Sequence, residues 1–347
     1  MAVDRVLLAE PRGFCAGVEK AIKALAWMVR VFEPPVYCYH EIVHNRHVVD
    51  AFVAQGVVFV DDVDDVPDGA PLMLSAHGTA PDVVDAARQR GRVVVDAVCP
   101  LVTKVHHEVR VRSRKGYTVL YVGHAGHEEA TGTIAVAPEA VRLVERPEDI
   151  DALEDLDADT PLALLAQTTL SHDEWSDIVE RARQRFPDLW MPGRSDLCFA
   201  TTNRQAALRA LVPSADAVVV IGSPNSSNTV ALTAVARSLG CPRVVLVDDA
   251  AELPDDLTGT VAVTAGASAP EAVVDAVLER LMPANGVETI PVVSEEEYFP
   301  PPPELRELLR AVETAVSLFA GRPAAPTDTP AADRLLAAAR VLEALPR

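Results

Sequence analysis

Short runs of Val, Ile and Leu recur along this 347-residue chain, and most of them end in a small polar turn that opens a helical pattern. Examples are the runs at residues 70–76, 118–125, 216–223 and 260–266. Continuous β-branched runs between amphipathic stretches are typical of parallel strands buried on both faces. The pattern therefore predicts an α/β fold with repeated crossovers. Because such folds bind ligands at the carboxyl ends of their strands, the polar turns are the candidate functional positions.

The polar turns recur with a period. Three cysteines are each followed by two polar turns, in the order Cys15, His44, His77, then Cys99, His127, Thr168, then Cys198, Ser226, Ser268. Matched spacing at roughly 90 residues is the signature of internal repetition. We infer a triplication into three small pseudo-equivalent parallel-sheet α/β domains, which would bring the three cysteines to one point.

This inference divides the chain into six parts. They are an N-terminal strand with the first cysteine turn (1–16), three α/β domains (17–99, 100–195 and 196–283), a segment closing the core (284–303), and a helical C-terminal extension (304–347). In the extension, one amphipathic helix at 304–321, a linker at 321–331 and a second short helix at 332–347 are expected. The sequence leaves two interpretations open, a loosely docked tail or an element for homodimerisation or donor docking.

Charge and cysteine usage limit the class of protein. With 31 basic and 51 acidic residues the formal net charge is −20, which argues against a nucleic-acid partner. A local positive pocket for an anion is still compatible with this charge. Five widely spaced cysteines do not resemble a secreted disulfide scaffold. Neither a signal peptide nor an apolar stretch of membrane-spanning length is apparent, so a cytoplasmic protein without a membrane partner is expected.

Three matched thiols suggest a metal centre with an open position. A structural zinc site needs four ligands, usually in C-x-x-C pairs, and a 4Fe-4S cluster normally has four cysteines. With Cys15, Cys99 and Cys198 alone, one iron would remain open to substrate. Packing at helix starts is the alternative for each thiol. Cys38 and Cys241 lie outside the pattern and are expected to be structural.

The other turns suggest an anion pocket and a proton donor. The polar set consists of His44, His77, His127, Ser226, Ser227, Asn228 and Ser268. Helix N-termini and imidazoles bind phosphate or diphosphate, although Ser226–Asn228 also reads as ordinary helix capping. Neither a P-loop nor a Rossmann motif occurs. Glu129, beside a histidine, is the candidate proton donor, and a solvated helix-start glutamate is the alternative.

Nine motifs resemble one known family in sequence and order. They are PRGFCAGV, HEIVHN, SAHG, DAVCPLVTKVH, GHAGHEE, QTTLS, CFATTNRQ, GSPNSSN and TAGASAP. Together they resemble the LytB-type 4-hydroxy-3-methylbut-2-enyl diphosphate reductases. The resemblance implies a cloverleaf of three α/β domains around a central 4Fe-4S cluster. It also implies that Cys15, Cys99 and Cys198 ligate three irons.

The same resemblance implies a reaction and partners. The polar set listed above would hold the diphosphate, while Glu129, Thr168 and His127 would serve catalysis, with Glu129 in the proton path. The expected reaction is reductive dehydroxylation to isopentenyl and dimethylallyl diphosphate, the last step of the non-mevalonate isoprenoid pathway. A ferredoxin or flavodoxin with its reductase would deliver the electrons. A hydro-lyase with the same open iron and an iron–sulfur redox sensor are the competing hypotheses.

The chain departs from the family pattern in three places. Glu128 stands where the family commonly has proline, and this extra charge could shift a neighbouring pKa. Pro224 replaces a residue that is often basic or polar. The family also usually ends soon after the segment matching 299–305, whereas this chain continues.

Overall fold

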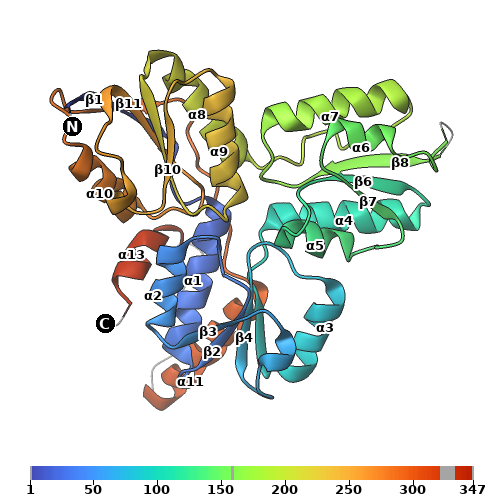
Figure 1. The fold of residues 1–347 in the computed structure, drawn as a ribbon. Helices are drawn as coiled ribbons and strands as arrows, with labels where there is room; N and C mark the ends of the chain where they lie inside the picture. Colours follow the sequence, from blue (N-terminus) through green and yellow to red (C-terminus); the bar gives the residue numbers. More distant parts are fainter. Residues whose placement is uncertain (1, 158–159, 321–332, 346–347) are drawn as a thin grey trace. The chain divides into compact units, whose positions relative to one another are not determined.

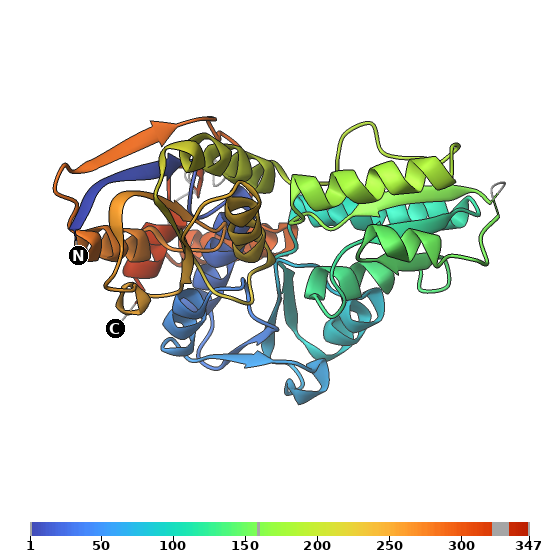
Figure 2. The same ribbon diagram turned by 45° about the horizontal axis from the view of Figure 1, so that its top comes forward.

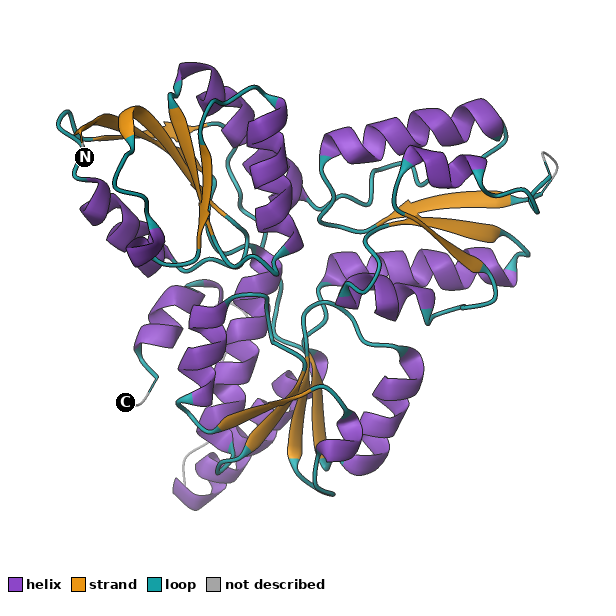
Figure 3. Ribbon diagram, in the orientation of Figure 1, coloured by secondary structure: helices purple, strands orange, loops and turns teal. Residues whose placement is uncertain are grey.

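The computed structural model describes residues 2–157, 160–320 and 333–345, and it confirms the predicted α/β class. Three parallel sheets are present in the described residues (Figures 1 and 3). The chain forms two compact units. The first unit comprises residues 1–15, 77–81 and 100–295, and the second comprises 16–76, 82–99 and 296–347.

The first unit contains a five-stranded sheet in the order β10-β9-β11-β1-β12. Its elements are β1 (Ala2–Glu10), α8 (Phe199–Leu211), β9 (Ala217–Ile221), α9 (Ser227–Ser238), β10 (Val244–Val247), β11 (Thr258–Ala265), α10 (Glu271–Leu281) and β12 (Val287–Pro291). Two 3-10 turns, η2 (Val212–Ser214) and η3 (Ala250–Glu252), connect them. Figure 2 shows dark-blue β1 beside orange β12 at the sheet edge.

The same unit contains a three-stranded sheet in the order β7-β6-β8. Its elements are α4 (Pro100–Arg114), β6 (Thr118–Val122), α5 (Glu128–Ile134), β7 (Val141–Val144), α6 (Pro147–Asp151), β8 (Leu162–Ala166) and α7 (His172–Arg185). Helices α6 and α7 cover one face of this sheet, and α4 and α5 cover the other (Figure 1).

The second unit is built on a four-stranded sheet in the order β3-β2-β4-β5. Its elements are α1 (Ala16–Val31), β2 (Val36–Tyr39), α2 (Arg46–Val53), β3 (Val57–Val60), η1 (Val63–Asp65), β4 (Pro71–Leu74), α3 (Pro81–Arg90), β5 (Val93–Asp96), α11 (Pro303–Ala320) and α13 (Ala338–Glu343).

The three sheets share one topology. In each sheet the first strand of the predicted repeat is flanked by the second strand on one side and by the third on the other. The resulting orders are β3-β2-β4, β7-β6-β8 and β10-β9-β11. The strand leading to the next cysteine then lies beside the third strand, as β5 does beside β4 and β1 beside β11. In the middle sheet a single bridge between Ala163 and Trp190 takes that place. The repeated order supports the inferred triplication.

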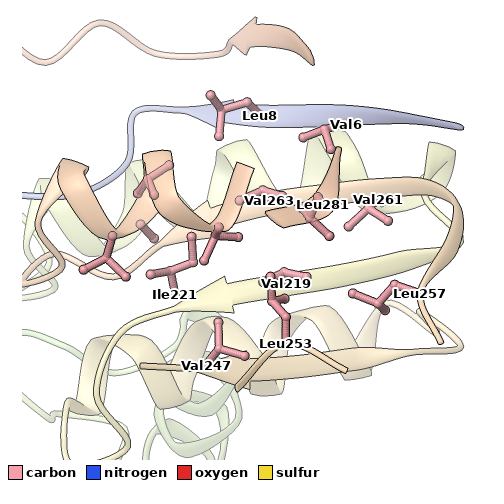
Figure 4. Close-up of a cluster of buried hydrophobic side chains, with 14 of the residues drawn as sticks. Val6, Leu8, Val219, Ile221, Val247, Leu253, Leu257, Val261, Val263 and Leu281 are labelled. Carbon is pink, nitrogen blue, oxygen red and sulfur yellow. The ribbon is translucent and has the colours of Figure 1, made fainter. Parts of the chain in front are cut away.

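Each sheet is buried on both faces, as the continuous apolar runs predict. In the five-stranded sheet, Val219 and Ile221 of β9 and Val261 and Val263 of β11 are fully buried against α10 and the η3 segment (Figure 4). The opposite face packs on α8 and α9. Because the cores fill both faces, the polar side chains that remain available gather at the strand ends.

The C-terminal extension folds in part as predicted. Helix α11 forms, and of its apolar side chains Leu305 is buried while Val312 and Val316 are exposed. The predicted linker at 321–331 lies outside the described residues. Residues 333–345 dock on α1, where Asp333 accepts hydrogen bonds from Lys23 Nζ at 3.0 Å and from the Tyr298 hydroxyl at 2.9 Å. In the second unit this segment is therefore docked rather than loose.

Replacing Asp333 with alanine is expected to lower the free energy of unfolding by about 3 kcal/mol, because it leaves the buried Lys23 ammonium without its closest carboxylate. Both side chains of that pair are only 5% exposed. Asp173→Ala, which breaks the exposed Arg209–Asp173 pair, is the control and should cost less than about 1 kcal/mol. Urea unfolding of both variants measures the difference, and equal costs would contradict the prediction.

Candidate functional site

The three predicted cysteine turns are held by the same backbone bond. Each cysteine N–H donates to a carbonyl in the turn that follows the third strand of the preceding repeat. The bonds run from Cys15 to Ala267 (3.1 Å), from Cys99 to Ala76 (2.9 Å) and from Cys198 to Thr168 (3.0 Å). The acceptors Ala267 and Ala76 directly precede the predicted ligand residues Ser268 and His77, and Thr168 is itself a predicted ligand residue. The fold thus ties every cysteine to a predicted substrate turn.

Each cysteine also stands at a helix start. Cys15 directly precedes α1, Cys99 directly precedes α4, and Cys198 caps α8 by accepting the Thr201 N–H on its Sγ at 3.2 Å. Gly13 has a φ of +65°, which glycine adopts without strain. The backbone of the first cysteine turn therefore favours glycine at this position.

The electrostatics at Cys198 fit a bound cation. Burial raises the pKa of Cys198 to about 12, and the neighbouring charge of Cys15 adds to the effect. A thiol that resists ionisation needs a positive centre before it can act as a thiolate ligand, which is what iron provides. None of the five cysteines is in a disulfide. Cys38 is fully buried on β2 and Cys241 lies in the loop after Gly240, consistent with structural roles.

Glu129 is buried, in contrast to the solvated alternative. Its side chain accepts the Thr168 N–H at 2.7 Å and the Thr168 hydroxyl at 2.8 Å. Burial raises the pKa of Glu129 to about 7, against the lowering effect of the two Thr168 hydrogen bonds. The carboxyl group can therefore hold a proton near neutral pH and release it, as a general acid must.

Tyr121 is a neighbour of Glu129 that the sequence pattern does not single out. It lies on β6 in an apolar run and is fully buried. Burial, and then the charge of Glu129, raise the Tyr121 pKa well above its ordinary value, so the phenol stays neutral. A tyrosine inside a strand carries no motif, so only tertiary packing reveals it.

The first polar turn of each repeat caps a helix in the same way. The side chains of Asn45, His127 and Ser226 accept N–H groups of Val48, Glu129 and Thr229 at the starts of α2, α5 and α9. The cap of α5 is the Nδ1 atom of His127, 3.1 Å from the Glu129 nitrogen. Because Nδ1 accepts, Nε2 carries the proton and is the donor available to an anion.

Glu128, the departure from the family pattern, binds a predicted ligand residue. Its Oε2 lies 2.8 Å from Nδ1 of His77. In the second unit, Nδ1 of His44 lies 3.4 Å from Oε2 of Glu41. A carboxylate accepts only from a protonated nitrogen, so Nδ1 carries a proton in both histidines and, in the neutral ring, Nε2 does not.

The turns after β6 and β9 enclose a pocket of about 370 Å³ in the first unit. His127, Ser227 and Pro224 are among its lining residues. Ser227 Oγ also accepts from the Thr169 hydroxyl at 2.9 Å. The pocket is therefore lined by two of the predicted diphosphate residues, one from the three-stranded sheet and one from the five-stranded sheet.

Asn228 and Ser268 are buried beside these turns. The Asn228 amide accepts the Ala267 N–H at 2.9 Å and donates to the Thr201 hydroxyl at 3.2 Å. Asn228 therefore links the turn that carries Ser268 to the helix that Cys198 caps. Gly266 is required beside it, because a Cβ there would lie 2.1 Å from Thr229 Oγ1.

Comparison with known proteins places these features in a family. A family model described as LytB protein matches residues 6–282. A curated relative from Acidothermus cellulolyticus, named 4-hydroxy-3-methylbut-2-enyl diphosphate reductase, is 46% identical, with 88% of this chain and 92% of that protein covered. A protein of the same name from Mycolicibacterium paratuberculosis is 49% identical, with 87% and 92% covered.

Solved structures agree with the sequence relatives. The chain is similar to the E-1-hydroxy-2-methyl-but-2-enyl-4-diphosphate reductase from Plasmodium falciparum, with a TM-score of 0.87, 32% identity, and 90% of this chain and 99% of that chain covered. A second structure, of an (E)-4-hydroxy-3-methyl-but-2-enyl diphosphate reductase described as the terminal enzyme of the non-mevalonate pathway, matches with a TM-score of 0.58 and 29% identity, covering 81% and 99%.

Proposed function

The chain belongs to the LytB protein family, and from this premise we propose how its own residues carry out the family's reaction. It is an oxidoreductase that reduces 4-hydroxy-3-methylbut-2-enyl diphosphate to isopentenyl and dimethylallyl diphosphate. The observation that carries the residue assignment is the buried Glu129–Thr168 pair, since the Thr168 carbonyl also receives the Cys198 N–H. A proton donor and a cysteine turn are thereby joined through one residue.

Cys15, Cys99 and Cys198 would hold a 4Fe-4S cluster, because they are outside any disulfide, stand at helix starts and have matching backbone bonds. When bound, the cluster supplies electrons one at a time and an open iron for the allylic hydroxyl. The balanced reaction takes two electrons and two protons, breaks the C–O bond, forms one C–H bond and releases water. Glu129 donates a proton in this balance, and Thr168 holds its carboxyl group in place.

His44, His77, His127, Ser226, Ser227, Asn228 and Ser268 would bind the diphosphate. The support is that several of them stand at helix N-termini, where N–H groups and the helix dipole favour anions. Remote binding of the diphosphate would orient the hydroxyl end for reaction.

We propose a ferredoxin or flavodoxin as electron donor, since the reaction needs single electrons. The six-part division with three domains, 17–99, 100–195 and 196–283, is likewise proposed from the repeated strand order. No helix in the described part of the chain is long and apolar enough to cross a membrane. A cytoplasmic location fits five cysteines that form no disulfide and a reduced carrier. Homodimerisation through the C-terminal extension is a proposal that size measurement would check.

An anaerobic assay tests the function. Protein reconstituted with iron and sulfide is incubated with the hydroxymethylbutenyl diphosphate, with and without a reduced one-electron carrier, and products are identified by mass spectrometry. We expect both isoprenoid diphosphates only when the carrier is present. Turnover without a donor would favour a hydro-lyase, and an intact cluster without any turnover would favour a redox sensor.

A further inference from the structure

A buried or paired basic residue follows each of the three matched cysteines. Lys20 lies on α1 after Cys15, Lys104 lies on α4 after Cys99, and Arg204 lies on α8 after Cys198. The separations are five, five and six residues, so each cation stands more than one helical turn beyond its cysteine. None of the three belongs to the polar turns described above.

Lys20 binds the turn before the second cysteine. Its ammonium donates to the carbonyl of Val98 at 2.8 Å, and Val98 directly precedes Cys99. Lys20 is only 8% exposed. The Asp96 carboxylate accepts the Val98 N–H at 2.9 Å, so the turn is held from both sides.

Lys104 binds the turn before the third cysteine. Its ammonium lies 3.0 Å from Oδ1 of Asp196, two residues before Cys198. The Asp196 side chain is fully buried, and its Oδ2 accepts the Ala166 N–H at 3.3 Å. Asp196 therefore links this turn to the end of β8, and the Lys104 ammonium compensates the negative charge of its carboxylate.

Arg204 binds the turn before the first cysteine. Its Nη2 donates to the Gly13 carbonyl at 2.7 Å, two residues before Cys15. The side chain is fully buried, and Nη1 pairs with Glu295 at 2.9 Å. The three contacts thus run from the first repeat to the second cysteine, from the second to the third, and from the third back to the first.

We propose that Lys20, Lys104 and Arg204 are positioning residues for the iron–sulfur centre, each fixing the turn that presents the next cysteine in a closed cycle. The proposal rests on the proposed role of the three cysteines as ligands. A ligand turn that is already rigid loses less conformational entropy when iron binds, so affinity for iron rises. Lys20 and Arg204 are buried cations, which are costly and rarely retained without a partner, whereas Lys104 is partly exposed and compensates a buried carboxylate. In all three repeats a cation on the helix after one cysteine contacts the turn before the next cysteine, through a backbone carbonyl for Lys20 and Arg204 and through the Asp196 carboxylate for Lys104.

The chain offers a matched control on the same helix. Lys23 of α1 is 4% exposed and donates to both the carbonyl and the carboxylate of Asp333. It therefore resembles Lys20 in burial and bonding but binds no cysteine turn through these contacts. A purely structural role for Lys20 predicts equal consequences for Lys20→Met and Lys23→Met.

Hydrogen exchange of the metal-free protein tests the cycle directly. Lys20→Met should speed amide exchange about 10- to 100-fold at residues 97–99, Lys104→Met at 196–198, and Arg204→Met at 13–15. Each change should appear at the next cysteine, with the turn of the preceding cysteine unchanged. Lys23→Met should leave all three turns unchanged. Lys20→Arg and Arg204→Lys keep the positive charge, so they should retain much of the wild-type protection of these amides against exchange.

Iron retention is the second readout. After reconstitution, each Met variant should lose iron to a chelator about 10-fold faster than wild type, and Lys23→Met should not. Faster exchange spread over the whole chain, or confined to the variant's own helix, would overturn the proposal. If a Met variant does not fold and the conservative replacement at the same position does not fold either, the proposal is also overturned. Because the exchange pattern needs neither iron nor substrate, an inactive wild type would overturn only the proposed function.

Discussion

Serine in place of any one of Cys15, Cys99 and Cys198 is expected to abolish tight iron binding and reduce turnover by more than about 100-fold. Loss of a residue that merely supports a ligand costs 10- to 100-fold in metal affinity, so loss of a ligand costs more. A hydroxyl is a poor substitute because iron–sulfur clusters select soft thiolates. Iron and sulfide quantitation, with electron paramagnetic resonance of the reduced protein, measures the loss independently of activity.

Cys38→Ala and Cys241→Ala are the matched controls, and both should keep iron and activity. Cys38 is fully buried on β2, so its replacement should cost about 1 kcal/mol of stability through a small cavity. Cys241 lies in a loop and contacts the Arg243 carbonyl, so its loss should be nearly neutral. If either residue proved necessary for the cluster, the assignment of the ligands by triplication would be wrong.

Glu129→Gln should lower kcat by roughly 10²- to 10⁴-fold while leaving the iron content unchanged, because it removes a positioned proton donor and keeps the side-chain volume. The two Thr168 bonds to the carboxylate show that the side chain is held in one geometry. Single-turnover product analysis with a reduced carrier separates this loss from slow product release. Full activity in Glu129→Gln would remove the proton-donor role and leave the reductase assignment intact.

The same variant should have a distinct pH dependence of stability. Burial raises the pKa of Glu129 from its ordinary value of 4.5 to about 7, so the folded state favours the protonated carboxyl. The stability that Glu129 contributes is fully present below pH 4.5 and is lost as pH rises through about 7. Between these limits the free energy of unfolding of the wild type should therefore fall by about 3 kcal/mol relative to that of Glu129→Gln.

Urea unfolding of the metal-free proteins at pH 5 and pH 8 measures that difference. Asp196, whose pKa is raised chiefly by burial, titrates in both proteins, so its contribution cancels to first order, and Tyr121 stays neutral throughout this pH range. The wild-type rate should also fall as pH rises above about 7, since the donor form is lost. A difference in stability that does not change with pH would mean that Glu129 ionises like an exposed carboxylate.

Much of the candidate site was predictable because its signals are local. A helix start after a polar turn can be recognised from a few neighbouring residues, and Asn45, His127 and Ser226 all cap helices in the structure. The α/β class followed from β-branched runs in the same way. The burial of Glu129 could not be predicted, since a glutamate at a helix start is equally consistent with a solvated surface position.

The repeat, the three matched cysteines and the family can be recognised in the amino-acid sequence, because these depend on residue type and spacing along the chain. Which turns are joined depends on the folded arrangement. It pairs Cys198 with Thr168 through the backbone, buries Glu129 against the same residue, and directs Arg204 to the Gly13 carbonyl 191 positions earlier. Such contacts depend on how sheets and helices pack, and a hydrogen bond between distant residues leaves no periodic trace in the chain.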